Sequence, residues 1–161
     1  MLNAIVLAAI SIMLSQGPPT RPVRVTPTVD GAAISVAGRP TWTVDCSPSD
    51  RGKVCHLIHT SVSAADGAPH VVLAADAPGL VCVAVPTNAM FRRAAFRIDD
   101  RPLLITDDNG CYRLRLVSRE LRDGRRWYSR WFVQGSPTPV EVAFDLVGIA
   151  EALGELDRLS P

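Results

Sequence analysis

Residues 41–62, TWTVDCSPSDRGKVCHLIHTSV, decide the fold class. Trp42, Val44 and Cys46 alternate with polar residues, and this period of two is typical of a strand with one buried face. Pro, Asp and Gly over 47–53 then supply a turn, and β-branched residues resume after it. The stretch therefore predicts a β-hairpin.

The rest of the chain repeats this pattern of short alternating runs between turn residues. Asn109-Gly110 and Asp123-Gly124 are tight-turn signals, because their residues tolerate positive φ. Further strands are expected over 71–75, 80–85, 94–99, 103–106, 111–118, 127–133 and 140–147.

The C-terminal segment changes its period. After Gly148 the apolar residues Ile149, Leu153 and Leu156 follow a spacing near 3.6, which predicts a helix. We therefore expect an all-β fold, an antiparallel β-sandwich of about eight short strands with one short C-terminal helix.

The composition fits one globular domain. The chain has 161 residues, of which 47% are hydrophobic and 20% are charged, as expected for a single folded core. Seventeen Lys+Arg against sixteen Asp+Glu leave a formal net charge of +1. No overall field therefore attracts the protein to nucleic acid or to an anionic membrane, and we expect no nucleic-acid partner.

The N-terminus has the character of an export signal. Ala4–Leu14 is an uncharged apolar run of eleven residues, whereas a membrane-spanning helix needs about 20. Ser15-Gln16-Gly17 follows where a signal peptidase would cut. We interpret 1–17 as a signal peptide, with a misassigned start or an uncleaved anchor as alternatives. The expected location is periplasmic or secreted, with no stable membrane span after signal removal.

Residues 18–40 have a different composition. They include five prolines and three arginines, and prolines at this density cannot donate backbone hydrogen bonds to a central strand. We predict a Pro-rich linker over 18–40, with a short edge strand over 31–38 as an alternative. The β-sandwich domain is predicted to occupy 41–159.

Four cysteines in an exported chain of this size suggest two disulfides. Three pairings are possible, and the local order favours Cys46 with Cys55 and Cys82 with Cys111. The spacings contain no Cys-x-x-Cys motif, which disfavours a metal site or a redox-active pair. We therefore expect a disulfide-braced fold without a metal.

No residue pattern points to catalysis. Strand residues three apart lie on opposite faces, so His56 and His59 would share a metal only across a bulge, and we interpret both as surface histidines. No serine lies in a Gly-x-Ser-x-Gly context. Asp99-Asp100 and Asp107-Asp108 lack the alternating ligand spacing of a calcium loop and are interpreted as solvated turns. We expect no catalytic residue and no cofactor.

An arginine cluster is the candidate binding surface. Seven arginines lie within 113–130, opposed only by Glu120 and Asp123, and aromatic residues follow at once. Arg and aromatic side chains are enriched in interface hot spots. The alternative is a solvated face whose aromatic residues belong to the core. The predicted partner-binding residues are Arg113 and Arg115, which would share a strand face, together with Arg125, Arg126, Trp127 and Tyr128.

Several short motifs resemble one known family in their order. They are Trp42-x-Val44-x-Cys46, Cys55-x-Leu57, Asn109-Gly110-Cys111 and the closing Val142-x-Phe144-x-Leu146-x-Gly148-Ile149-x-x-Ala152-Leu153. Together they resemble the invasion-associated locus B family of exported bacterial proteins, over Thr41 to about Leu156. The resemblance implies a periplasmic or surface-exposed all-β sandwich of Gram-negative bacteria, linked in some pathogens to host-cell entry, with no established catalytic chemistry.

One cysteine departs from that family's pattern. Its members usually carry a cysteine shortly before their Gly-Cys, whereas the fourth cysteine of this chain is Cys82, far upstream of Cys111. The resemblance therefore does not supply the second disulfide.

These observations predict an exported, non-enzymatic binding module, periplasmic or surface-associated, that engages an unknown protein or an anionic envelope component. The alternative is a small periplasmic enzyme or enzyme inhibitor. A pocket holding His56 or His59 beside a buried carboxylate would favour the enzyme. A flat exposed Arg face would favour the binding module.

Overall fold

The computed structural model describes residues 21–50, 52–62, 69–76, 79–83, 91–133 and 137–160. These residues form two antiparallel sheets and two α-helices around a shared core. The predicted disulfide-braced, all-β antiparallel fold is confirmed. The predicted signal peptide over 1–17 lies outside the described residues.

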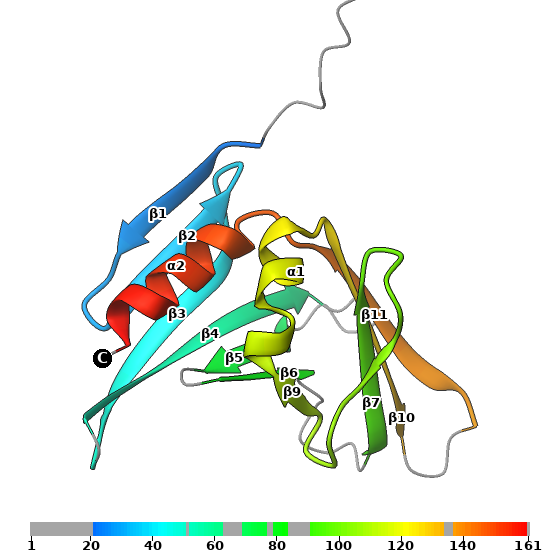
Figure 1. Cartoon of the computed structure of the whole chain (residues 1–161). Coiled ribbons are helices and arrows are strands. Elements are labelled where there is room, and N and C mark those ends of the chain that lie inside the picture. The colour runs from blue at the N-terminus through cyan, green and yellow to red at the C-terminus, as the bar shows by residue number, and fades with distance from the viewer. Residues whose placement is uncertain are drawn as a thin grey trace, which may run out of the picture.

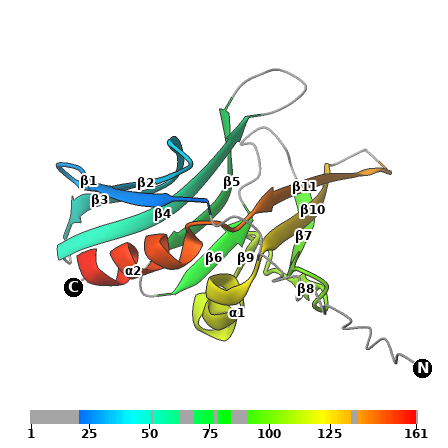
Figure 2. The ribbon, with the colours of Figure 1, turned by 90° about the horizontal axis from the view of Figure 1, so that it is seen from above.

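The larger sheet has seven strands in the order β1-β2-β3-β4-β5-β6-β9. The first six follow one another along the chain as antiparallel neighbours, and β9 adds a strand at the far edge (Figures 1 and 2). Its strands are β1 (Val23–Pro27), β2 (Gly31–Val36), β3 (Arg39–Ser49), β4 (Gly52–Val62), β5 (Pro69–Asp76), β6 (Leu80–Val83) and β9 (Cys111–Arg113).

The predicted hairpin over 41–62 lies at the centre of this sheet. Trp42 pairs with His59, and Cys46 pairs with Cys55, across β3 and β4. Trp42, Val44 and Cys46 are buried, while the residues between them are exposed. The alternation in the sequence therefore gave the correct inward face.

The smaller sheet has four antiparallel strands in the order β11-β10-β7-β8. Each of them was expected from the sequence pattern, within a few residues at the ends. The strands are β7 (Phe91–Ile98), β8 (Leu104–Ile105), β10 (Arg126–Val133) and β11 (Pro139–Asp145). Eleven strands in the described residues exceed the predicted eight.

The predicted C-terminal helix is α2 (Ile149–Leu159). It buries Ile149, Leu153 and Leu156 and lies across β2 and β3 (Figure 1). Gly148 precedes it with φ of 86°, and a Cβ at this position would approach the Trp42 ring at 3.3 Å. Glycine therefore provides both the left-handed backbone and the room for the entry into α2.

The strand predicted over 111–118 is wrong beyond Arg113. The chain turns into a 3-10 helix over Leu114–Leu116 and then into α1 (Ser118–Asp123), where Leu121 is buried. A helix this short has too little sequence to show a helical period, so the alternating residues were mistaken for a longer strand. None of the helices in the described part of the chain combines the length and the apolar character that a membrane crossing requires.

The linker predicted over 18–40 is also wrong, because β1 and β2 belong to the sheet. Ala32 and Ile34 of β2 are fully buried, and β2 is paired on both sides. Pro27 is the last residue of β1, which is an edge strand, so its missing N–H costs little. The folded domain therefore includes residues from Val23 onward.

Aromatic side chains join the two sheets. His59 of β4 stacks on Phe144 of β11 with 4.1 Å between ring centroids, and Trp42 of β3 lies 6.2 Å from the same ring. In the smaller sheet Phe96 stacks on Trp127 at 4.3 Å. The two sheets thus bury their inner faces against each other, as in a sandwich.

Both predicted disulfides are formed. Cys46–Cys55 joins β3 to β4 on the inner face and is buried. Cys82–Cys111 joins β6 to β9 at the edge of the larger sheet and is half-buried. The two bridges are therefore compatible with folding in an oxidising extracellular or periplasmic location.

Candidate binding site

The central strand of the smaller sheet carries two kinds of residue in alternation. Trp127, Ser129 and Trp131 are buried against the core. Arg126 and Arg130 are exposed, and Tyr128 between them is half-buried. Successive strand residues point to opposite faces, so these three lie on the outer face of the sheet.

Tyr128 lies at the centre of the outer face. Its partner positions on the neighbouring strands are Arg97 of β7 and Ala143 of β11. The Arg97 guanidinium lies 4.2 Å from the Tyr128 ring centroid, and that of Arg126 lies 5.5 Å from it. Both distances are in the range of cation–π contacts, so Tyr128 holds two guanidinium groups on the surface.

The next row of the outer face runs across all four strands. Arg130 is the partner of Glu141 on β11 and of Ala95 on β7, and Ala95 is the partner of Ile105 on β8. Ile105 is 62% exposed, and further along β10 Phe132 is 42% exposed. We call the surface formed by the outward residues of β7, β8, β10 and β11 the outer face.

A shallow open hollow of about 530 Å³ lies on this face. Ala143, at the partner position of Tyr128 on β11, has a small side chain and is one of its lining residues. The residues that line the hollow are Arg97, Leu103, Tyr128, Ser129, Arg130, Glu141, Val142 and Ala143.

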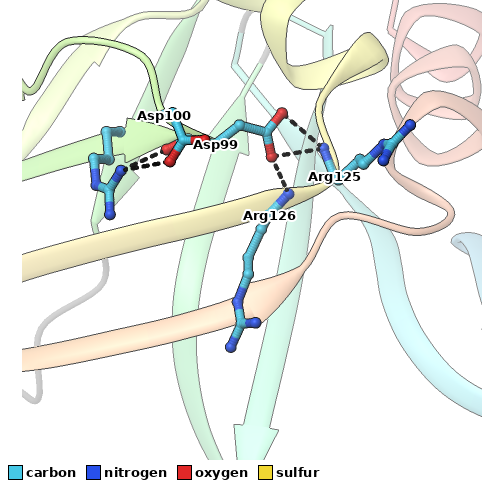
Figure 3. A network of polar contacts seen from close by, with 5 residues as sticks. Asp99, Asp100, Arg125 and Arg126 are labelled. Atoms are coloured by element: carbon cyan, nitrogen blue, oxygen red, sulfur yellow. Dashed lines mark hydrogen bonds and ion pairs between the residues drawn. The ribbon is translucent and has the colours of Figure 1, made fainter.

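A carboxylate fixes the start of β10 (Figure 3). Asp99 Oδ1 accepts hydrogen bonds from the backbone N–H of Arg126 at 2.8 Å and of Arg125 at 3.1 Å. The Arg97 guanidinium donates to the Asp99 carbonyl oxygen at 2.8 Å and lies 3.6 Å from Asp100. Asp99 therefore positions the Arg97 guanidinium and the backbone at the start of β10. The sequence had predicted only a solvated turn at Asp99-Asp100.

The arginines of the predicted cluster fall into two groups. Arg119 and Arg122 form ion pairs with Asp123 and Asp157 at 3.7 and 2.8 Å. Within the described ranges, Arg113, Arg115, Arg125, Arg126 and Arg130 form no ion pair. The unpaired positive charge is thus carried by the residues outside α1.

The predicted partner-binding residues do not form one surface. Arg113 and Arg115 are exposed but lie on β9 and the 3-10 helix, so they do not share a strand face. Arg126 and Tyr128 lie on the outer face. Arg125 precedes β10, and Figure 3 shows its side chain pointing away from that of Arg126.

Trp127 is fully buried and stacked on Phe96, which excludes it from any exposed binding surface. The prediction for this residue is wrong, because adjacent strand residues point to opposite faces and the face opposite that of Arg126 is covered by the core. The alternative that the aromatic residues belong to the core is correct for Trp127 and Trp131.

The predicted binding residues did not include six residues of the outer face: Arg97, Leu103, Ile105, Arg130, Phe132 and Glu141. Arg97 stands between Phe96 and Ile98 in an otherwise apolar run, and that alternation already indicated an outward position. Only the strand order places it beside Tyr128, because β7 and β10 are far apart in the sequence.

The two histidines differ in their surroundings. His56 is exposed as predicted, but His59 is only 6% exposed, and burial lowers its pKa to about 4. His59 lies between the rings of Trp42 and Phe144, and its Nδ1 has no hydrogen-bond partner. No carboxylate among the described residues is buried beside it. The surface interpretation of His59 is therefore wrong.

Asp107 serves the structure of its turn. Its Oδ1 accepts hydrogen bonds from the backbone N–H of Asn109 at 3.0 Å and of Cys111 at 2.8 Å. In the part of the chain that the structure describes, no group of three or more His, Cys, Asp and Glu side chains is arranged to hold a metal ion.

Comparison with protein-family models, with curated proteins and with solved structures gave no match.

Proposed function

We propose that this chain is an exported, non-enzymatic binding module, periplasmic or surface-associated, that engages a protein or an anionic envelope component through the outer face. The observation that carries the proposal is the outward row of β10, in which the half-buried Tyr128 lies between the exposed Arg126 and Arg130. These two arginines form no ion pair with a described residue. The inward residues of the same strand, in contrast, are buried in the fold.

The composition of the outer face supports binding. Tyr and Arg are the residue types most often found in interface hot spots, and Ile105 and Phe132 add exposed apolar surface beside them. Exposed apolar side chains beside guanidinium groups that form no ion pair with a described residue are the composition expected of a surface that a partner covers.

Export is supported by two separate features. The apolar run Ala4–Leu14 resembles the central region of a secretory signal, and both disulfides favour an oxidising compartment. The resemblance to the invasion-associated locus B family supports the same location. Intact-mass analysis of the protein from cell fractions should find it outside the cytoplasm, cleaved between about Ser15 and Thr20. Uncleaved protein in the cytosol would contradict export.

Two double variants test the proposed face. R126Q/R130Q removes two positive charges from the outer face, and R113Q/R115Q removes the same charge from the larger sheet and the 3-10 helix. Each oxidised domain is immobilised and exposed to envelope extract. We expect R126Q/R130Q to lose capture of components bound by the unmodified protein, and R113Q/R115Q to retain it.

The opposite pattern would move the binding surface to β9. Equal loss in both variants would show that capture reflects total charge alone, and equal retention would show that neither surface binds. Salt should weaken capture by the unmodified protein, because exposed charges are screened beyond about 8 Å at physiological ionic strength.

A further inference from the structure

The charges of the outer face indicate the sign of the partner. Arg126 and Arg130 form no ion pair with a described residue. Asp145 lies at the partner position of Arg126 on β11, but its carboxylate is 3.4 Å from the Arg21 guanidinium. Arg97 lies 3.6 Å from the fully exposed Asp100. Glu141 is the acidic residue of the hollow. The guanidinium groups of Arg126 and Arg130 therefore leave the face with positive charge that is complementary to carboxylates of a partner.

The apolar residues indicate the class of the partner. Leu103, Ile105 and Phe132 are 40%, 62% and 42% exposed, and a purely polar polyanion would leave them in water. Glu141 beside Arg130 would be repelled by a dense array of phosphates such as an anionic bilayer. A protein surface that mixes acidic and apolar side chains fits both features.

The spacing along β10 indicates how such a surface is arranged. Alternate strand residues are about 6.6 Å apart, which places Arg126 and Arg130 about 13 Å apart with Tyr128 midway. An extended peptide presents its own alternate side chains with the same repeat. An acidic residue, an apolar residue and a second acidic residue at alternate positions would therefore match Arg126, Tyr128 and Arg130.

The central ring is held in place before a partner arrives. The Arg97 guanidinium packs 4.2 Å from the Tyr128 ring centroid and is itself fixed by its hydrogen bond to the Asp99 carbonyl oxygen. Little side-chain freedom is then lost when an apolar side chain contacts the ring.

We infer that the outer face binds an extended acidic segment of a protein partner, with the pattern acidic-x-apolar-x-acidic, whose carboxylates pair with Arg126 and Arg130 and whose apolar side chain covers Tyr128. This inference rests on the proposed function, because it names the partner of the same face.

The probe is the acetylated and amidated peptide Thr-Thr-Glu-Thr-Leu-Thr-Glu-Thr-Thr, titrated into the ¹⁵N-labelled oxidised domain and followed by amide chemical shifts. This method detects millimolar affinities, which are expected for two exposed ion pairs and one apolar contact. We expect shifts concentrated in β10 and β7. In R126Q/R130Q the affinity should fall about tenfold, while R113Q/R115Q should keep it.

Two control peptides test the pattern. One moves the second Glu by one position, so that the two carboxylates project from opposite faces of the extended chain, and the other replaces both Glu by Gln. The shifted peptide keeps one ion pair and should bind about threefold more weakly, and the Gln peptide loses both and should bind about tenfold more weakly. Equal binding of the shifted peptide would overturn the spacing, and shifts at β9 in place of β10 would overturn the site.

Two further probes separate the alternative partners. Vesicles of phosphatidylglycerol and a soluble uronic-acid polysaccharide are tested against the same variants. Stronger binding of either one through Arg126 and Arg130, with no response to the peptide, would overturn the inference while leaving the proposed function intact. Capture of envelope components that persists unchanged in R126Q/R130Q would instead overturn the proposed function.

Discussion

The inner and outer residues of β10 differ in nearly every property although they alternate along a single strand. Trp127, Ser129 and Trp131 are at most 5% exposed and lie in the core. Arg126 and Arg130 are exposed, and the ring between them contacts guanidinium groups. The inward residues of β10 therefore stabilise the fold, and its outward residues form the surface that we propose binds a partner.

This comparison shows why a cluster defined along the sequence is a poor guide to a β-surface. Arg126 and Trp127 are adjacent, yet one faces the solvent and the other is fully buried in the core. Arg97 is distant in the sequence but contacts Tyr128. The proposed binding surface is therefore defined by the register between strands.

The largest expected effect comes from the inner face. Trp127→Ala removes a fully buried ring that stacks on Phe96, and such truncations cost about 3–5 kcal/mol of unfolding free energy. Urea denaturation should show this loss. Trp127→Phe should cost much less, because the indole N–H has no hydrogen-bond partner to lose. An unchanged unfolding free energy in Trp127→Ala would show that the inward residues of β10 do not stabilise the fold.

The two disulfides also differ in their exposure to solvent. Cys46–Cys55 is buried, whereas Cys82–Cys111 is half-buried at the edge strand β9. Thiol exchange requires access to a sulfur, so a mild reductant should open Cys82–Cys111 first. Alkylation followed by peptide mapping measures the order. Earlier opening of Cys46–Cys55 would contradict the difference in access.

Removing each disulfide should also change stability by different amounts. The bridged cysteines are 29 residues apart for Cys82–Cys111 and 9 for Cys46–Cys55. In the chain-entropy description these loops correspond to about 3.6 and about 2.7 kcal/mol of unfolding free energy. Paired Cys→Ala variants measured by urea denaturation should therefore rank in this order.

His59 makes the stability of the fold sensitive to pH, because its ring lies buried between Trp42 and Phe144. Its pKa is lowered to about 4 in the folded protein, whereas the unfolded chain titrates near 6.5. Between these values the unfolded state binds more protons, so stability is lost as the pH falls. The loss should reach about 3 kcal/mol of unfolding free energy by pH 4.

Urea midpoints at pH 7 and at pH 4.5 measure this loss. His59→Gln should show a smaller loss of stability between the two pH values, and His56→Gln, an exposed control, should keep the loss of the unmodified protein. An equal loss in the His59 variant would assign the acid sensitivity to other groups.

Much of the fold could be predicted from local pattern. The hairpin over 41–62, the C-terminal helix and both disulfides follow from period, turn residues and cysteine order. The failures occurred where a local signal was misleading or too short. Pro22 and Pro27 suggested a linker but lie at the ends of an edge strand, and α1 is too short to show a helical period.

The candidate site could be predicted only in part. Arg126 and Tyr128, predicted as partner-binding residues, both lie on the outer face, but the contact of Tyr128 with Arg97 depends on which strands become neighbours. The burial of His59 depends on Phe144 from the other sheet. Such partners are set by tertiary packing, and the sequence pattern of a single strand does not contain them.

The smallest expected effect on stability comes from the outer face. R126Q/R130Q changes two exposed side chains that form no ion pair with a described residue, and exposed substitutions usually stay within about 0.5 kcal/mol each. Its melting temperature should match that of R113Q/R115Q. A much lower melting temperature would show that these arginines stabilise the fold. It would contradict the claim that only the inward residues of β10 do so.

Photo-crosslinking tests the central claim, that the outer face contacts the partner, most directly. A benzoylphenylalanine is placed at Phe132 on the outer face or, in a matched variant, at Arg113 on β9, and the producing cells are irradiated. We expect an adduct from position 132 that disappears in the R126Q/R130Q background, and no adduct from position 113. An adduct from position 113 alone would contradict the proposal and place the partner on the larger sheet.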